Sequence, residues 1–309
     1  MKRIVLSIIL SILSSLAFAQ DNHPVSWKFS AEETGPSKFK VLINALIKEP
    51  YHIYPQQSSG GGLGMPTEIH FEANPNVEFV GEVQEKGLED HGTEAPAYYK
   101  KEVIFSQVVR LKGDKPTTLS FRIKYMACND FMCLPPSSKQ FTLDINGRQE
   151  QEKDPKTGVG TASVTAAEKA LVYEDFLMAD TAGRSVSSKE ITGKAKYTFI
   201  DFWASWCAPC RQQGRALIPL YTKYRSKGLE VIAVSLDTNP AAWKKAIVAD
   251  GYTWANLSDS KGFESPIIVK YGIIAIPRNF LIDRNGKVVA KDLHGSELEA
   301  KLAELFKIN

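Results

Sequence analysis

The sequence predicts two domains in series, an all-β sandwich followed by an α/β domain, and three observations indicate this. In the first half of the 309 residues, short alternating or β-branched segments lie between clusters of Gly, Pro, Asn and Asp, as in a sandwich. In the second half, strand and helix patterns alternate as in a βαβ unit. Residues 146–168 have almost no large apolar side chains, so we expect a linker there. The domains are then residues 20–145 and 169–309.

The first 19 residues have the pattern of a secretory signal peptide. Lys2 and Arg3 precede an apolar run, and Ala17 and Ala19 supply the small residues of a cleavage site. The run is shorter than the roughly 18 apolar residues that a membrane-spanning helix needs. No cysteine follows the cleavage site, so we expect no lipid anchor there. The mature chain is therefore expected to be exported, periplasmic, soluble and not membrane-spanning.

Charge and cysteine usage narrow the function further. The formal net charge of +3 includes the two signal-peptide cations, so the mature chain is close to neutral. This balance gives no basic surface for nucleic acid. All four cysteines lie in the mature part as two close pairs, in a compartment where disulfides persist.

Five strands are expected in the first domain from their alternation and β-branched content. They are Lys40 to Leu46, Thr67 to Phe71, Val103 to Leu111, Thr118 to Tyr125 and Gln140 to Ile145.

The second domain is expected to contain a βαβ unit, a hairpin and a closing helix. Strands are predicted at Tyr197 to Trp203, Glu230 to Leu236, Asn279 to Asp283 and Lys287 to Ala290, and helices at Cys207 to Arg225, at Ala241 to Ala249 and from about Ser296. The Asn-Gly pair at 285 and 286 is typical of a tight hairpin turn.

Cys207 and Cys210 begin a helix directly after a buried strand. A thiolate is the attacking species in disulfide exchange, and the partial positive charge of a helix N-terminus stabilises it. We therefore predict that Cys207 is the nucleophile. Cys210 lies one helical turn further along, where it can attack the mixed disulfide that Cys207 forms and release the reduced partner.

The Cys207 and Cys210 pair has three alternative interpretations. A zinc site needs two more ligands at short range, and the nearest other cysteine, Cys133, is far upstream, so no metal is expected. A structural disulfide does not explain Pro209 between the cysteines or the aromatic-rich strand before them. Copper binding by the reduced pair remains an open alternative.

The second domain resembles the thioredoxin-fold disulfide reductases of the TlpA and ResA type, over about residues 169–309. The similarity lies in DFWASWCAPC at 201–210, VSLD at 234–237, AIP at 275–277 and FLID at 280–283. The resemblance implies a thioredoxin-like fold with Cys207 exposed, Cys210 buried and a cis Pro277 beside them.

The same resemblance implies how a substrate binds. An extended substrate strand is expected to pair across Ile276 and Pro277. Trp206, Pro209 and Arg278 are expected to contact it. The sequence departs from the pattern at Arg278, where Thr is common, which would place a positive charge at this groove, and at Arg215, where thioredoxins have a kink-forming proline.

Asp201 matches the buried acid of thioredoxin, whereas many TlpA-type relatives have Asn there. A buried carboxyl has a raised pKa and could accept the proton of Cys210 during resolution. The alternative is an aspartate paired with a lysine at the strand edge. His294 is expected to be a surface residue.

Residues 125–136, YMACNDFMCLPP, resemble the disulfide loop of the N-terminal domain of the thiol:disulfide interchange protein DsbD, with YHIY at 51–54 as further similarity. The resemblance implies an immunoglobulin-like sandwich whose pair, Cys128 and Cys133, relays electrons from a thioredoxin-like domain. The alternative is a structural staple, but closing so small a ring would add only about 2 kcal/mol. Tyr98 and Tyr99 either cover the pair or belong to the core.

The expected enzyme is thus a protein-disulfide reductase, a thiol-disulfide oxidoreductase that needs no cofactor beyond its own disulfides. Oxidised protein thiols are the expected substrates, with the haem-attachment cysteines of apocytochrome c as one candidate from cytochrome c biogenesis. DsbD has a membrane-embedded domain where this chain has a linker, so a separate membrane-embedded thiol donor is implied. The alternative is a client-binding β domain with a structural disulfide, attached to a thioredoxin-like reductase.

Overall fold

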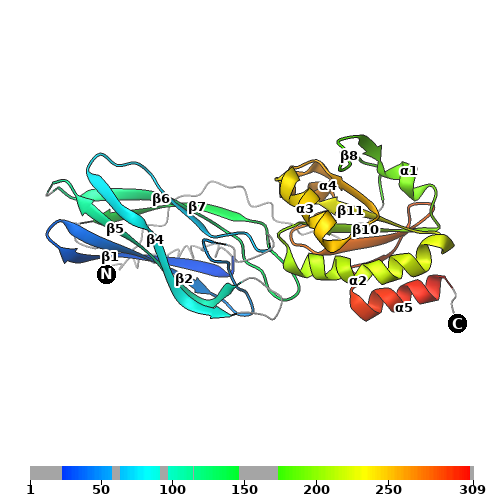
Figure 1. The fold of residues 1–309 in the computed structure, drawn as a ribbon, viewed down its shortest axis with the longest axis horizontal. Coiled ribbons are helices and arrows are strands. Elements are labelled where there is room, and N and C mark those ends of the chain that lie inside the picture. Colours follow the sequence, from blue (N-terminus) through cyan, green and yellow to red (C-terminus); the bar gives the residue numbers. More distant parts are fainter. Residues whose placement is uncertain (1–22, 58–62, 91–96, 114, 146–172, 307–309) are drawn as a thin grey trace, which may run out of the picture.

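The computed structural model describes residues 23–57, 63–90, 97–113, 115–145 and 173–306. The expected signal peptide, 1–19, and the expected linker, 146–168, lie outside the described residues. Figure 1 shows a strand-rich body, coloured blue to green, beside a body in which helices cover a sheet, coloured green to red. The predicted class, an all-β sandwich followed by an α/β domain, is confirmed.

Seven strands in two antiparallel sheets form the first body. They are β1 (Val25–Gly35), β2 (Lys38–Ile47), β3 (Glu68–Phe71), β4 (Val77–Asp90), β5 (Tyr98–Leu111), β6 (Thr117–Tyr125) and β7 (Ser137–Ile145). One sheet has the order β1-β2-β5-β4 and the other β3-β6-β7. All five predicted strands are present. The two edge strands β1 and β4 were not predicted. The signal was present in β1, where Val25, Trp27, Phe29 and Ala31 alternate with polar residues, whereas two glycines interrupt the pattern of β4.

The sandwich core follows from strict alternation in its central strands. Buried and half-buried residues alternate along all of β2, so Val41 and Ile43 point inward with no exposed surface. Phe105 of β5 and Phe121 of β6 meet them from the two sheets, and both are fully buried. This packing gives the disulfide loop that follows β6 a rigid base.

The second body has a seven-stranded sheet with the order β14-β13-β10-β11-β12-β8-β9. Its elements are β8 (Leu177–Ala179), β9 (Ser185–Ser187), α1 (Ser188–Thr192), β10 (Tyr197–Trp203), α2 (Ala208–Tyr224), β11 (Leu229–Ser235), α3 (Pro240–Asp250), β12 (Ala255–Ser258), α4 (Pro266–Lys270), β13 (Arg278–Asp283), β14 (Val288–Lys291) and α5 (Gly295–Leu305). Two short 3₁₀ turns lie at Arg225–Lys227 and Gly262–Glu264.

The central strand β10 positions the site. It pairs in parallel with β11 and antiparallel with β13, and six of its seven residues are buried, as expected for a strand covered on both faces. The βαβ unit, the hairpin and the closing helix are confirmed. The elements that were not predicted, β8, β9, α1, β12 and α4, have three to five residues each, which is too short for a periodic pattern. Helix α2 runs to Tyr224 with Pro219 inside it.

Candidate active site

Cys207 lies at the end of the buried strand-turn segment and caps helix α2. Its backbone is extended, and its Sγ accepts the N–H of Cys210 at 3.3 Å. Pro209 lies in the first turn, where a missing N–H removes no helical hydrogen bond. Cys207 and Cys210 are joined as a disulfide with their Cα atoms 5.2 Å apart. The sequence therefore places one sulfur at the positive end of a helix, as predicted.

The two sulfurs are not exposed in this arrangement. Cys207 is 0% exposed and Cys210 1% exposed. The expectation of an exposed Cys207 is therefore wrong for this structure, because the sandwich domain covers that end of α2.

The sandwich contacts this end through main-chain hydrogen bonds. The N–H of Cys133 donates to the carbonyl of Ile276 at 2.8 Å, and the N–H of Ile276 donates back to Cys133 at 3.2 Å. The Ile276–Pro277 peptide is cis, as the resemblance implies. The carbonyl oxygen of Ile276 lies 3.9 Å from Sγ of Cys207. Cys133 therefore occupies the strand position beside the cis proline where a substrate strand was expected.

A second main-chain contact comes from a glycine. The N–H of Gly64 donates to the carbonyl of Trp206 at 2.9 Å. Gly64 has a φ of +76°, and a Cβ there would lie 2.3 Å from the ring of Tyr54. Only glycine meets both demands, so the contact with the residue before Cys207 depends on it.

The disulfide of the sandwich domain also lies at this contact. Cys128 and Cys133 are bonded with their Cα atoms 4.1 Å apart, and both are fully buried. All four cysteines belong to one hydrophobic cluster, which also contains Tyr54 and Met126 of the sandwich. The structure thus brings together the two pairs that the sequence places in separate domains.

A side-chain amide supports the loop between Cys128 and Cys133. Asn129 accepts the N–H groups of Phe131 and Met132 at 2.9 and 2.8 Å, which closes a tight turn between the cysteines. Phe131 is 77% exposed, so the turn presents an apolar side chain at the surface.

His52 pairs with Cys128 through two main-chain hydrogen bonds of 2.8 and 3.1 Å. Its ring stacks on Tyr98 with centroids 4.3 Å apart, and its Nε2 lies 3.2 Å from Oη of Tyr54. Burial, with Tyr98 as the smaller cause, raises the pKa of Tyr54. Tyr99 is a core residue of the sandwich, and Tyr98 packs against the cluster that contains the four cysteines.

Asp201 lies on β10 and is 3% exposed. Nε2 of Gln213, on α2, donates to its Oδ1 at 3.0 Å. Burial raises the pKa of Asp201 to about 7, and the Gln213 hydrogen bond opposes this rise. The side chain that binds it is an amide and not the lysine of the alternative interpretation.

Gln213 was missed by the sequence reasoning. The available signal was its spacing: it lies three residues after Cys210, one turn along the same side of the helix. A helix that presents Cys210 to the core therefore presents Gln213 to the same strand.

A buried polar network fixes the turn before Cys207. Asp237 accepts the N–H and Oγ–H of Ser205 at 2.8 and 2.6 Å, and the hydroxyl of Ser235 at 2.8 Å. Burial raises the pKa of Asp237, against these hydrogen bonds. Arg211, directly after Cys210, forms a buried ion pair with Asp250 at 2.6 Å. Both interactions hold the start of α2 in place.

The remaining predicted contact residues lie around the paired strand. Trp206 and Pro209 are half-buried, and Ile276 is fully buried. Arg278 forms an ion pair with Asp292 at 2.9 Å. The positive charge expected at the groove is therefore partly balanced by a neighbouring carboxylate.

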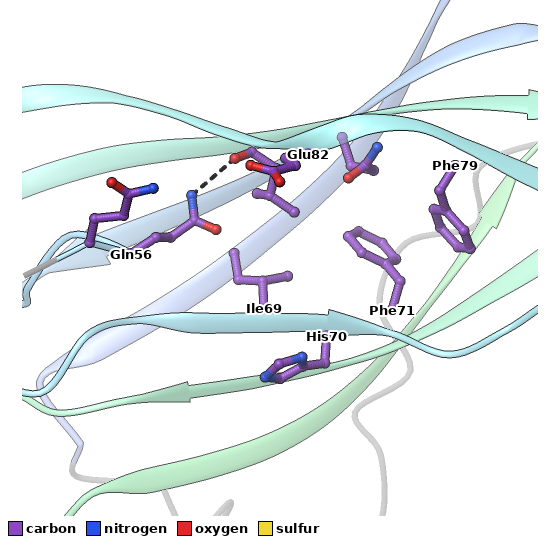
Figure 2. Close-up of a pocket in the computed structure, with 9 residues that line it drawn as sticks. Gln56, Ile69, His70, Phe71, Phe79 and Glu82 are labelled. Carbon is purple, nitrogen blue, oxygen red and sulfur yellow. Dashed lines mark hydrogen bonds between the residues drawn. The ribbon is translucent and has the colours of Figure 1, made fainter.

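A hollow also lies on the sandwich, away from the cysteines. Figure 2 shows it between β3 and β4, with Ile69 and Phe71 on one side and Phe79 and Glu82 on the other. Its volume is about 470 Å³, and no cysteine lines it. Across the described ranges, no group of three or more His, Cys, Asp or Glu side chains could hold a metal ion. In that same part of the chain, no helix has the length and apolarity to cross a membrane.

Two family models match the two bodies. Residues 21–145 match the N-terminal domain of the thiol:disulfide interchange protein DsbD, and residues 171–291 match the AhpC/TSA family. Both matches exclude residues 146–170, most of which were predicted to be a linker.

Among curated proteins, the chain is similar to the thiol-disulfide oxidoreductase ResA of several bacilli. It is 33% identical to the protein of Bacillus thuringiensis subsp. konkukian over 133 residues, which is 43% of this chain and 73% of that protein. For the protein of Bacillus anthracis the identity is 34% over the same coverage. Among solved structures, the thioredoxin domain of a thiol-disulfide oxidoreductase from Bacteroides vulgatus is 31% identical, with a TM-score of 0.42, over 44% of this chain and 96% of that one.

Proposed function

Because this chain belongs to the thiol-disulfide oxidoreductases of the ResA type and carries a DsbD-type N-terminal domain, we propose that it is a periplasmic protein-disulfide reductase in which both cysteine pairs exchange electrons. Its proposed parts are a signal peptide (1–19), a sandwich (20–145), a linker (146–168) and a thioredoxin-like domain (169–309). The signal pattern at the N-terminus supports the periplasmic location.

One observation carries the proposal. The main chain of Cys133 pairs with Ile276 by two hydrogen bonds, beside the sulfur of Cys207. This is the way an extended substrate binds a free strand edge. The sandwich therefore presents its own disulfide to the thioredoxin-like domain as a substrate.

The exchange then balances as follows. The thiolate of reduced Cys207 attacks Sγ of Cys133, the Cys128–Cys133 bond breaks, and Cys128 leaves as a thiolate. Cys210 loses its proton and attacks Cys207, which releases Cys133. Two electrons pass from Cys207 and Cys210 to Cys128 and Cys133. The thiolates of Cys128 and Cys133 take up two protons, which replace the one that Cys207 lost on forming its thiolate and the one that Cys210 gave to Asp201.

The other site residues have supporting roles in this proposal. Asp201 accepts the proton of Cys210, because it is buried and has a pKa near neutrality. Ile276 and Pro277 form the edge on which the partner strand pairs. Trp206, Pro209 and Arg278 contact that strand, since they surround the edge.

Oxidised protein thiols are the proposed substrates, and the haem-attachment cysteines of apocytochrome c are one candidate. A membrane-embedded thiol carrier is the proposed donor, because the DsbD-type N-terminal domain is a module of an interchange system. Electron transfer needs only the two disulfides, without a metal or an organic cofactor. This direction of electron flow, from donor through Cys207 to Cys133 and then to clients, is part of the proposal.

A trapping experiment tests the contact between the pairs. The double variant Cys128→Ser, Cys210→Ser leaves Cys133 and Cys207 as the only thiols. Mild oxidation of this full-length variant is expected to form an intramolecular Cys133–Cys207 disulfide, detected by mass spectrometry of the digested protein. The bond should form because Cys133 pairs with Ile276, whose carbonyl oxygen lies 3.9 Å from Sγ of Cys207.

The matched control is Cys133→Ser, Cys210→Ser, which leaves Cys128 and Cys207. Its intramolecular bond should form at least tenfold more slowly, because Cys128 is not paired with Ile276. Equal rates for the two variants, or only intermolecular dimers, would contradict the relay. The sandwich would then be a client-binding domain with a structural disulfide.

A further inference from the structure

We propose that His294 is a positioning residue of the redox site, because it fixes the amide of Gln213 in the orientation that donates to Asp201. The geometry is a chain of three side chains from three elements. Nδ1 of His294, at the start of α5, contacts Oε1 of Gln213 on α2. Nε2 of Gln213 then donates to Oδ1 of Asp201 on β10 at 3.0 Å. The chain runs from an exposed histidine to a fully buried carboxyl.

The direction of donation along this chain is fixed by chemistry. An amide oxygen only accepts hydrogen bonds, so Nδ1 of His294 must carry its hydrogen. The amide nitrogen of Gln213 is then left facing Asp201. If the amide were reversed, its oxygen would face the Asp201 carboxylate, and two acceptors would oppose each other. His294 therefore selects the amide orientation that supports the ionised form of Asp201.

The fold holds His294 in place through a buried asparagine. Asn279 is 0% exposed, and it lies opposite Asp201 in the β10–β13 pairing. Its Oδ1 accepts the N–H of Leu293 at 2.9 Å, and its Nδ2 donates to the carbonyl of Leu293 at 3.0 Å. Leu293, the residue before His294, is thus held through both its N–H and its carbonyl by a side chain of β13, the strand next to Asp201.

The groups around Asp201 leave Gln213 as its main electrostatic support. Cys210 and Gln213 lie one turn apart on α2, and Tyr252 interacts electrostatically with Asp201 from the segment after α3. At the register of Asp201, the neighbouring strands contribute Ala233 and Asn279, which do not titrate. If the amide loses its orientation, the pKa of Asp201 should rise, since burial is then opposed by no hydrogen bond from Gln213.

The test is the pH dependence of mixed-disulfide resolution in the full-length protein. Cys207 is first converted to a mixed disulfide with a small aromatic thiol, and release of that thiol is followed by stopped flow from pH 5 to 9. This readout needs neither the relay nor a client. Gln213→Leu should raise the pH midpoint attributed to Asp201 by about one pH unit, because loss of a hydrogen bond to a charged group changes a pKa by about that amount.

His294→Ala should raise the same midpoint, by up to the shift of Gln213→Leu, without lowering the melting temperature. His294→Asn should return the midpoint most of the way to its native value. Nδ2 of asparagine is attached to Cγ, as is Nδ1 of histidine, so it can donate to Gln213 from the same distance along the side chain. The control is His70→Ala, an exposed histidine of the sandwich that contacts Glu68 at 3.3 Å; its profile should match the native protein.

An unchanged midpoint in His294→Ala, or a rate lowered equally at every pH, would overturn the inference. The inference rests on the proposed role of Asp201, and Asp201→Asn separates the two. If Asp201→Asn leaves the pH profile unchanged, the kinetic role of Asp201 fails. Carbon-detected NMR titration of the Asp201 carboxyl in His294→Ala then decides the positioning role alone: a raised pKa supports it and an unchanged pKa refutes it.

Discussion

The proposed role of Asp201 predicts a pH dependence of mixed-disulfide resolution, and its size follows from the burial of the carboxyl. With a pKa of about 7, about one tenth of Asp201 is ionised at pH 6 and about nine tenths at pH 8. Only the carboxylate can accept the proton of Cys210. Resolution should therefore accelerate about tenfold between these pH values through Asp201 alone.

Asp201→Asn removes this contribution while it keeps nearly the same shape. A general base contributes about 100-fold or more, so the variant should resolve mixed disulfides about 100-fold more slowly at pH 8. Near pH 5 the difference should be small, because the native carboxyl is then protonated. Formation of the mixed disulfide should be little affected, since Cys207 acts in that step.

The assay is stopped-flow release of a chromogenic thiol from Cys207, in the native protein and in the variant. The ratio of the two rates isolates Asp201, because ionisation of Cys210 contributes to both. A ratio that is constant from pH 6 to 9 would remove Asp201 from the mechanism. A ratio that rises with pH and levels off above about pH 8 supports it.

Four further outcomes are expected. Cys207→Ser should abolish reduction of insulin, whereas Cys210→Ser should accumulate mixed disulfides on gels run without reductant; equal accumulation by both variants contradicts their division of roles. Asp201→Asn should also raise the free energy of unfolding by at most about 4 kcal/mol at pH 8 and hardly at pH 4. The pKa of Asp201 is higher in the folded than in the unfolded protein, so the native protein loses stability as the pH increases from the unfolded pKa to about 7. An equal gain at both pH values in urea titrations would argue against a raised pKa. Electron transfer from reduced Cys207 and Cys210 to the Cys128–Cys133 disulfide should be independent of protein concentration in the intact chain. At one micromolar it should be about a thousandfold faster than between separated domains, since a linker gives an effective concentration near millimolar. Quenched-flow alkylation measures both rates. Gly64→Ala should loosen the contact with Trp206 and speed alkylation of reduced Cys207 by iodoacetamide, because its Cβ would collide with Tyr54; unchanged labelling would mean that the contact does not shield the sulfur.

The elements that the sequence predicted are those whose signal is local. The strand before Cys207 is rich in aromatic and β-branched residues, and the helix after it begins with a capping sulfur and a proline. Cys210 and Gln213 are related by helical spacing, so their common direction was also accessible. The edge strand β4 was harder to recognise, because Gly81 and Gly87 interrupt its alternation, whereas the alternation of Val25, Trp27, Phe29 and Ala31 made β1 accessible.

The burial of Cys207 could not be predicted, because it depends on a contact between residues more than one hundred positions apart. Ile276 and Cys133 pair through main-chain atoms, which leave no trace in side-chain patterns. The link between His294 and Gln213 also joins residues far apart in the sequence, since the side-chain amide of Asn279 binds the backbone of Leu293 and so places the histidine there. Sequence therefore predicted the reacting residues better than their partners.

The single strand edge at Ile276 also determines the order of the reaction steps. Two hydrogen bonds to one residue can be satisfied by one extended segment at a time. In the proposed relay, the donor and the loop of Cys133 must therefore use this edge in turn, and no complex with both forms there. Steady-state rates should follow ping-pong kinetics, with parallel lines in double-reciprocal plots, and excess donor should slow electron transfer to Cys133 because it occupies the edge.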